Sequence, residues 1–204
     1  KSSAALACAA ARALNEASWT GLSDPQIVDI AVAAQRRSGC TLTGSMDDAW
    51  AAISPGWKLV DPEQASHDSI LLEGDIETGL SVLVALRGPR NGRVEPEAFA
   101  NQSKLFERAL ASLSSGSIFA AMSANGMAVA AATGDDEALR ICNSAIVRGA
   151  ISAGVTGSGP AIAIICYEQH ADSLAEFVRE SGMEVIAAAF TQSRMQSEEA
   201  SRWE

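Results

Sequence analysis

The sequence has little positive charge and no long apolar run, and each absence argues against a class of protein. Its 204 residues include 15 Lys and Arg against 25 Asp and Glu, a formal net charge of -10. Because clustered Lys and Arg bind nucleic-acid backbones, these few scattered cations argue against a nucleic-acid partner. Polar or charged residues interrupt the apolar stretches well short of a membrane span, and no segment resembles a signal peptide. We therefore expect a soluble, cytoplasmic protein that binds neither nucleic acid nor membrane.

Cysteine and histidine are also scarce, and their spacing argues against a zinc site or a disulfide framework. The four cysteines stand apart from one another among small or apolar residues, without a C-x-x-C pair, and the chain has only two histidines. Isolated cysteines of this kind are typical of buried thiols in a reducing compartment. We expect such thiols at Cys8, Cys40, Cys142 and Cys166.

The sequence does have enough apolar content to form a substantial core. Hydrophobic residues make up 48% of the chain, which suits one large domain or two smaller ones. The chain begins at Lys1 without a methionine. We interpret it as processed or as a fragment, and we expect the 204-residue chain alone to be inactive because it lacks an upstream segment.

Apolar spacing and turn residues predict helices and then strands in the first part of the chain. Alanine and leucine from residue 2 to about 17 favour a helix whose small side chains let neighbours approach closely. Asp24 and Pro25 begin a second helix that ends near Ser38. A short helix is expected at 47–53, and three strands at 57–60, 69–74 and 80–86 are expected to form an antiparallel meander.

A serine and glycine stretch at 114–116 predicts a division into domains of residues 1–115 and 116–204. A helix at about 96–113 precedes it, and two apolar helices separated at Gly134 and Asp135 follow it. A glycine turn, a buried strand, a helix at 171–181 and a strand at 183–190 complete the pattern. This order predicts an α+β fold with helices on one face of an antiparallel sheet.

The first candidate motif is Lys1-Ser2-Ser3, which opens the alanine-rich helix. The N–H groups at a helix start, two hydroxyls and a lysine could form an anion site for phosphates. An ordinary serine cap beside a chance lysine would produce the same three residues.

The second motif is the acidic pair Asp47 and Asp48, which follows Thr41, Thr43 and Ser45 and starts the short helix. Acids at this position often only cap a helix. Two adjacent carboxylates could instead supply a base for a substrate hydroxyl and a ligand for Mg²⁺.

The third motif is T-G-S-G-P at 156–160, ahead of a buried strand. Glycine and proline are common turn residues, so one interpretation is a tight turn between a helix and a strand. Glycines could also let the backbone come close to a bound ligand.

In this order, the three motifs resemble the GHMP kinase superfamily over essentially the whole chain. In that superfamily a G-L-x-S-S-A loop, a central acid and a late glycine-rich turn form the site. The lysine of K-S-S-A and the motifs G-S-M-D-D-A and T-G-S-G-P-A most resemble the archaeal-type shikimate kinases, as does A-N-G at 124–126. The homoserine kinases, which share a short glycine turn, are the nearest alternative.

This resemblance implies a two-domain α+β fold with helices packed on antiparallel sheets. The N-terminal part would be like ribosomal protein S5 domain 2, incomplete because half of its phosphate loop would lie upstream of Lys1, and the C-terminal part would be ferredoxin-like. The implied activity is transfer of phosphate from ATP, with Mg²⁺, to the 3-hydroxyl of shikimate, in the pathway to chorismate and aromatic amino acids. Homoserine phosphorylation and a non-catalytic regulatory domain stay open as alternatives.

Carried over by position, the resemblance also implies roles for individual residues. Asp47 would be the catalytic acid that accepts the proton of the substrate hydroxyl or orients that hydroxyl. Lys1, Ser2 and Ser3 would bind the phosphates of ATP, and the two serines would also bind Mg²⁺.

The resemblance places Asp48, Gly157, Ser158, Gly159 and Pro160 in the substrate and phosphate region. Several superfamily members carry a metal-binding Glu on the helix before the catalytic acid, but residues 30–46 contain no acid. Asp48 or water would then complete the metal shell. The carboxylate of shikimate would need a cationic partner, and the candidates are Arg87, Arg90, Arg148 and Lys104.

Overall fold

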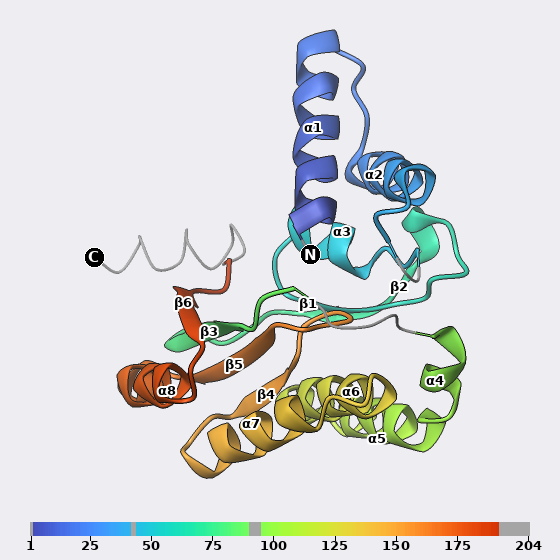
Figure 1. Cartoon of the computed structure of the whole chain (residues 1–204). Coiled ribbons are helices and arrows are strands. Elements are labelled where there is room, and N and C mark those ends of the chain that lie inside the picture. Colours follow the sequence, from blue (N-terminus) through green and yellow to red (C-terminus); the bar gives the residue numbers. More distant parts are fainter. Residues whose placement is uncertain (1, 42–43, 90–94, 192–204) are drawn as a thin grey trace. The chain divides into compact units, whose positions relative to one another are not determined.

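The computed structural model describes residues 2–41, 44–89 and 95–191, without the side chains of residues 2 and 96 (Figure 1). These residues form two compact units. The first contains the described residues up to Glu77 together with Phe190 and Thr191, and the second is Thr78–Ala189. None of the helices in the described ranges is both long and apolar enough to cross a bilayer.

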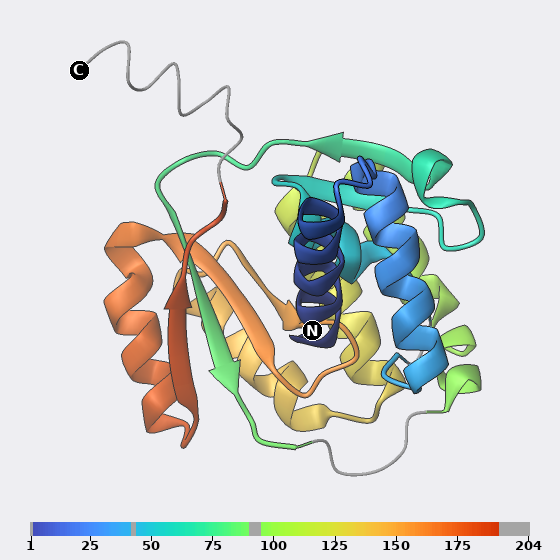
Figure 2. The same ribbon diagram turned by 90° about the horizontal axis from the view of Figure 1, so that it is seen from above.

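The first unit packs three helices with a two-stranded sheet. Its elements are α1 (Ser2–Ser18), α2 (Asp24–Ser38), α3 (Asp47–Ile53), β1 (Trp57–Val60), a 3₁₀ turn (Ser66–Asp68) and β2 (Ile70–Gly74). The two strands pair antiparallel, and Figure 2 shows α1 beside α2, which it contacts. The helices and strands predicted for this unit agree with these bounds to within one residue.

Local sequence signals explain where α2 begins and ends. Pro25 lies in its first turn, and the side chain of Gln26 accepts a hydrogen bond from the backbone N–H of Ser23, the N-cap residue. At the other end Gly39 adopts the left-handed conformation with φ of 68° and donates its N–H to the carbonyl of Arg36. Both ends of the helix are therefore determined by local residues that can be recognised in the sequence.

The core of the first unit forms where small residues of α1 meet the other helices. Cys8 and Ala11 on α1 are buried with Ala49 and Trp50 on α3. The indole Nε1 of Trp50 donates to the buried Ser69 Oγ at 3.0 Å, which joins α3 to the start of β2. Small side chains at the α1 contact allow the short helix α3 to lie close against it.

The second unit is a four-stranded antiparallel sheet covered by helices. Its elements are β3 (Leu80–Leu86), α4 (Pro96–Ala100), α5 (Ser103–Ser114), α6 (Ile118–Ala132), α7 (Asp136–Val147), β4 (Ser152–Val155), β5 (Ile162–Tyr167), α8 (Glu168–Glu180) and β6 (Glu184–Ala188). The strand order is β4-β5-β3-β6, and neighbouring strands pair antiparallel. Numbered within this unit, the order is 2-3-1-4 in a β-helices-β-β-α-β chain, which is the ferredoxin-like arrangement.

The helices of this unit cover one face of the sheet. Leu83 lies opposite Ile164 and Ala85 opposite Ile162 in the register of β3 and β5, so all four point to the same face. These side chains are buried in one core with residues of α6, α7 and α8. The predicted α+β class, with helices on an antiparallel sheet, is confirmed.

The predicted meander is wrong in its third strand. β3 pairs with β5 and β6 instead of with β2. The reason lies in its sequence, LSVLVAL, because a nearly continuous apolar strand is stabilised in the middle of a sheet more than at the end of a hairpin. The predicted boundary at residues 115 and 116 falls inside this unit, in the turn between α5 and α6, since the ferredoxin-like arrangement begins at β3.

Three smaller features also differ from the expected pattern. The helix expected at 96–113 is interrupted at Asn101 and Gln102, where asparagine favours a turn. β4 was not predicted, because its four residues include a glycine. Three cysteines are buried as expected, but Cys40 is exposed because it directly follows the glycine that ends α2.

Candidate active site

The starts of α1 and α3 lie at the same end of the first unit. Cys8 Sγ donates to the carbonyl of Ala49 at 3.7 Å, and Arg12 Nη2 donates to the carbonyl of Ile53 at 3.2 Å. The second contact lies four residues, about 6 Å of helix axis, further from the start of both helices than the first. The predicted site residues Ser3 and Asp47 therefore lie toward the same end.

Ser3, in the first turn of α1, is held by a buried residue of α2. Its Oγ donates to Oε1 of Gln35 at 3.2 Å, and the amide Nε2 of Gln35 donates to the carbonyl of Ala31. Gln35 is only 9% exposed. With its hydrogen directed to Gln35, the Ser3 oxygen still has lone pairs to offer to a donor or a cation.

Sequence reasoning missed Gln35, although a signal was present. Gln35 lies four residues after Ala31 and seven after Val28, both of which are buried, so it occupies an apolar position of the helix repeat. A glutamine at such a position needs polar partners because burial of an unpaired amide is costly. That requirement would have pointed to a polar group on a neighbouring element.

Asp47 and Asp48 occupy the first turn of α3, as predicted. The side chain of Asp47 is exposed and that of Asp48 is half-buried. Carboxylates at this position lie near the unpaired N–H groups of the helix start, which stabilise their negative charge.

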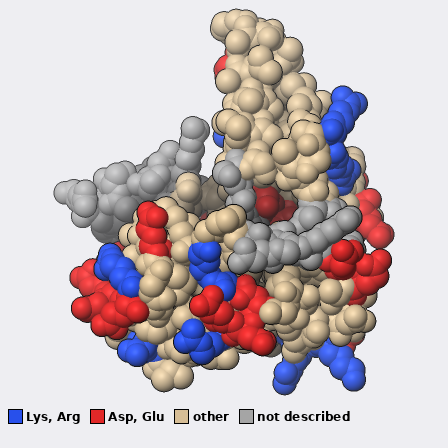
Figure 3. Space-filling view, in the orientation of Figure 1, with Lys and Arg blue, Asp and Glu red and all other residues tan. Residues whose placement is uncertain are grey.

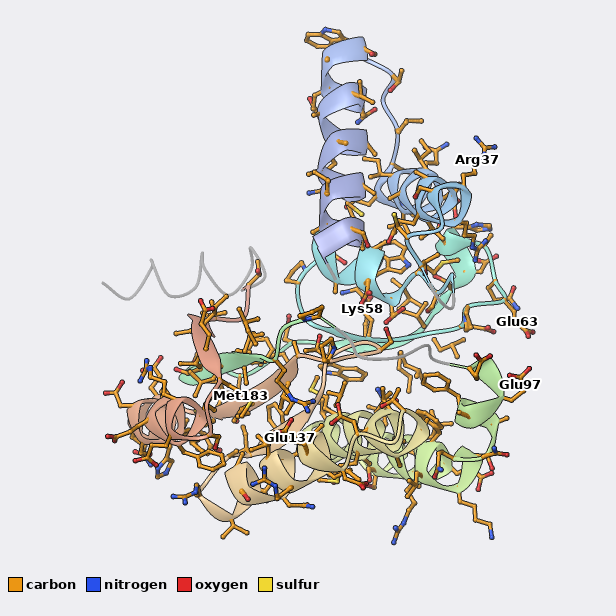
Figure 4. All side chains as sticks on the ribbon, in the orientation of Figure 1. Arg37, Lys58, Glu63, Glu97, Glu137 and Met183 are labelled. Atoms are coloured by element: carbon orange, nitrogen blue, oxygen red, sulfur yellow. The ribbon has the colours of Figure 1, made fainter. Side chains whose placement is uncertain are left out.

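The loop ahead of these acids is fastened to α2. Arg36 Nη2 donates to the carbonyl of Gly44 at 2.6 Å, and the Gly44 N–H is bound by Thr41 Oγ1 at 3.0 Å. Gly44 has φ of 68°, and a Cβ there would lie 2.7 Å from Nε of Arg36. The glycine thus allows the arginine to fix the approach to α3. The next residue, Arg37, extends from the outer side of the same helix (Figure 4).

In the second unit, the T-G-S-G-P motif forms the turn between β4 and β5. This corrects the expected turn between a helix and a strand. Thr156 N–H donates to the carbonyl of Ala161 at 2.9 Å, and Gly159 N–H donates to the carbonyl of Thr156 at 3.0 Å. Gly157 and Gly159 have φ of 58° and 82°, values that favour glycine, so the sequence of this turn follows from its backbone.

The A-N-G segment at 124–126 also has a structural explanation. Gly126 on α6 faces Gly154 on β4 so closely that a Cβ on Gly126 would lie 2.5 Å from the Gly154 Cα. Next to this contact, Ser123 Oγ and Ser152 Oγ are 3.0 Å apart and form a hydrogen bond. The glycines therefore let α6 lie directly on the strand that leads into the T-G-S-G-P turn.

The cations considered as partners for a substrate carboxylate are engaged in different ways. Arg87 binds Asp135 and Glu137, and Arg148 lies 4.6 Å from the centre of the Phe177 ring. Lys104 is exposed on α5, and Arg90 lies outside the described residues. On the face seen in Figure 3, described cationic and acidic side chains alternate without forming a large basic patch.

The Arg87 pair changes the titration of its partner. Its hydrogen bonds hold the pKa of Asp135 below the ordinary carboxyl value, although burial acts in the opposite direction. The same hydrogen bonds raise the pKa of Arg87. This ion pair therefore stays charged at neutral pH.

The carboxylate and hydroxyl oxygens of the first unit suit Mg²⁺, the metal that the resemblance implies, as ligands. Among the described residues, no group of three or more His, Cys, Asp or Glu side chains could hold a metal by itself. Mg²⁺ does not require such a cage, because it keeps several waters and is bound by one or two carboxylates together with substrate phosphates. Asp47, Asp48 and the Ser3 hydroxyl offer donors of this kind. Lys1 and the Ser2 side chain lie outside the described residues.

The structure thus collects the predicted residues in two groups. Ser3, Asp47 and Asp48 belong to the first unit, with Gln35 as an addition. The turn from Gly157 to Pro160 belongs to the second unit. Each group is ordered by contacts within its own unit.

Family models for the GHMP kinases match both parts of the chain. The model of the GHMP kinase N-terminal domain matches residues 1–56, and the model of the C-terminal domain matches residues 106–183. The chain belongs to the GHMP kinase family.

Three curated relatives of the chain are archaeal. A shikimate kinase of Methanobrevibacter smithii is 30% identical over 76% of this chain and 52% of its own length. A shikimate kinase of Thermoplasma acidophilum is 32% identical over 79% of this chain and 58% of its own length. The chain therefore spans little more than half the length of these relatives.

Solved structures share the fold at low sequence identity. A phosphotransferase related to the CoA biosynthesis pathway has a TM-score of 0.69 at 16% identity, covering 94% of this chain and 62% of that one. The L. major mevalonate kinase in complex with R-mevalonate has a TM-score of 0.62 at 16% identity, covering 94% and 66%. A homoserine kinase from Cytophaga hutchinsonii has a TM-score of 0.59 at 14% identity, covering 88% and 62%.

Proposed function

We propose that the protein transfers the γ-phosphoryl group of ATP to the 3-hydroxyl of shikimate, in the pathway to chorismate and aromatic amino acids. The observation that carries this proposal is the similarity to archaeal shikimate kinases, three of which are 27–32% identical over at least 76% of this chain. The double acid after G-S-M supports the choice of shikimate over homoserine, whose kinases share a short glycine turn.

In the proposed reaction, a bond forms between the substrate 3-oxygen and the γ-phosphorus, and the bond from that phosphorus to the β,γ-bridging oxygen of ATP breaks. Asp47 accepts the hydroxyl proton or orients the hydroxyl for in-line attack, and ADP leaves. The backbone N–H groups at the start of α1 bind phosphate oxygens, and the lone pairs of the Ser3 hydroxyl would bind Mg²⁺. Bound Mg²⁺ would neutralise charge that develops on the phosphates.

Gln35 supports this assignment of Ser3. The hydrogen bond from Ser3 to Gln35 keeps the hydroxyl in one orientation, with its oxygen lone pairs directed away from the amide. We also propose that Asp48 in the first unit and, separately, the turn from Gly157 to Pro160 in the second unit contact phosphate or substrate. The glycines of that turn allow close approach of the backbone to a ligand.

A coupled ADP-release assay tests the proposal on the protein at its full natural length, with Mg-ATP and either shikimate, homoserine or mevalonate. We expect turnover with shikimate alone. Asp47→Asn should lower kcat at least about 100-fold, because general acid-base catalysis contributes about that much or more. Asp172→Asn is the matched control, since Asp172 is an exposed acid on α8, and it should behave like the unsubstituted protein.

Other outcomes would contradict specific parts of the proposal. Turnover with homoserine instead of shikimate would agree with the family assignment but contradict the proposed substrate. Absence of turnover together with absence of saturable Mg-ATP binding in calorimetry would favour the non-catalytic alternative. Full activity of Asp47→Asn would remove Asp47 from the reaction.

A further inference from the structure

Arg87 links three separate segments of the second unit through one buried guanidinium. It directly follows β3, and its side chain is only 11% exposed. Nη1 and Nη2 bind both carboxylate oxygens of Asp135, at 2.5 Å and 2.9 Å, and Nη2 also binds Glu137 at 2.5 Å. Nη1 also donates to the carbonyl of Pro160 at 3.3 Å. Arg87 thereby connects the end of β3 and the start of α7 to the T-G-S-G-P turn.

The surroundings of Arg87 argue against a role in binding an anionic substrate. One cation already faces two carboxylates, so the cluster carries a net negative charge and would repel a further carboxylate. In the described ranges its Nε has no hydrogen-bond partner, so its hydrogen bonds to described residues come from the two Nη atoms. Arg87 is therefore a connecting residue, although its charge made it a candidate for the substrate carboxylate.

The two carboxylates contribute differently to this cluster. Asp135 is 20% exposed, binds both Nη atoms and caps α7 by accepting the N–H of Ala138 at 3.0 Å. Glu137 is 58% exposed and lies on the first turn of α7 (Figure 4). A partly buried, two-point pair fixes the plane of the guanidinium, whereas an exposed carboxylate contributes little. Asp135 thus determines the direction in which Nη1 meets Pro160.

An anchor from outside suits this turn because Gly157 and Gly159 adopt positive φ angles and glycine loses much conformational freedom on ordering. Thr156 N–H and Gly159 N–H donate hydrogen bonds within the turn, and Arg87 Nη1 adds a bond from outside it. We infer that Arg87 is a positioning residue, held by Asp135, that fixes the turn from Gly157 to Pro160 for binding of the substrates. This inference rests on the proposed function for the meaning of the turn.

Hydrogen exchange of the turn amides tests the positioning directly, without any measurement of activity. Arg87→Lys keeps the charge but cannot reproduce contacts from two planar nitrogens. Exchange of the Thr156 and Gly159 amides should then rise about tenfold or more, as expected for loss of one hydrogen bond from a charged donor. Asp135→Asn should have the same effect, although asparagine still caps α7. Glu137→Gln is the matched control and should leave both amides unchanged.

Kinetics on the full-length protein then separate positioning from general stabilisation. We expect Arg87→Lys and Asp135→Asn to raise KM for shikimate or ATP at least fivefold, with kcat within twofold, well below the Tm of each variant. This pattern indicates loss of binding that is equal in the ground state and the transition state. A residue that only stabilised the fold would lower Tm without changing KM at this temperature.

Each outcome decides the inference. Unchanged exchange of the turn amides in Arg87→Lys and in Asp135→Asn overturns it, whether or not turnover is observed. Faster exchange with unchanged KM also overturns it, because the turn would then be anchored without consequence for binding. Absence of turnover in the unsubstituted protein contradicts the proposed function instead. The Kd for Mg-ATP from calorimetry then replaces KM, and an unchanged Kd overturns the inference.

Discussion

Gly126→Ala tests the closest helix-to-strand contact in the second unit. A Cβ at this position would lie 2.5 Å from the Cα of Gly154 and 2.8 Å from the amide nitrogen of Val155. Both are backbone atoms, which cannot rotate away as a side chain could, so α6 must move off β4. Overpacking of this kind typically lowers the free energy of unfolding by about 1–3 kcal/mol, and occasionally by more. Alanine is favoured over glycine inside a helix by about 1 kcal/mol.

The steric cost therefore exceeds the gain in helix propensity, and we expect the free energy of unfolding to fall by about 2 kcal/mol. For a unit of this size that corresponds to a loss of about 8 °C in Tm. Circular dichroism during thermal and urea unfolding measures both quantities. Asn125→Ala is the matched control, because Asn125 is exposed on the same helix, and it should leave Tm unchanged or slightly higher. An unchanged or raised Tm in Gly126→Ala would refute the reasoning.

Three further predictions concern the two units separately. Gln35→Leu removes the acceptor of the Ser3 hydroxyl, so KM for Mg-ATP should rise several-fold and the free energy of unfolding should fall by about 1 kcal/mol. An unchanged KM would contradict a role of the Ser3 hydroxyl in binding Mg-ATP. A thiol reagent should label Cys40 alone in the native protein, because the other three thiols are buried. Burial raises the pKa of each of these three, and that of Cys142 to about 11. Fast labelling of two or more thiols would contradict this prediction. Arg87 holds the pKa of Asp135 low, so their ion pair stabilises the fold fully above the ordinary carboxyl pKa, and this stabilisation is lost as pH falls through the lowered pKa. In urea unfolding, the difference in stability between the unsubstituted protein and Asp135→Asn should therefore shrink from pH 7 to pH 3. A difference that stays constant with pH would contradict the assignment of the ion pair.

The helices could be predicted from the sequence because their signals are local. Pro25 and Gly39 mark the ends of α2 within its own residues, and the Gly134 and Asp135 pair separates α6 from α7. Such signals depend on backbone preferences that act over a few residues. Their success therefore does not depend on knowing the tertiary fold.

The strand partners could not be predicted in the same way because pairing is not local. β3 and β5 are separated by more than seventy residues along the chain, so no pattern within either strand indicates their pairing. β4 contains Gly154, which weakens a strand by propensity. In the structure that glycine is required for the contact with α6, so a tertiary need overrides the local preference.

The candidate site shows the same division. The starts of α1 and α3 were predicted from hydroxyl and carboxylate residues, but their common end follows from contacts between the helices at Cys8 and Arg12. Arg87 was selected from its charge alone. Its partners lie 48 and 50 residues further along the chain, beyond the reach of any local pattern, and they change its role from binding a substrate to fixing a turn.

The absence of an acid from the segment that precedes Asp47 is consistent with these contacts. Residues 30–46 contain no Asp or Glu, yet Gln35 reaches the Ser3 hydroxyl from this helix. An amide oxygen accepts the same hydrogen bond as a carboxylate oxygen, but it carries no charge. A buried carboxylate without a cation would be costly in a nucleotide-free protein, whereas the buried amide is satisfied by Ser3 and Ala31. In the proposed enzyme, the protein charge available to Mg²⁺ would thus come from the acids of α3, and Gln35 would contribute the orientation of the serine.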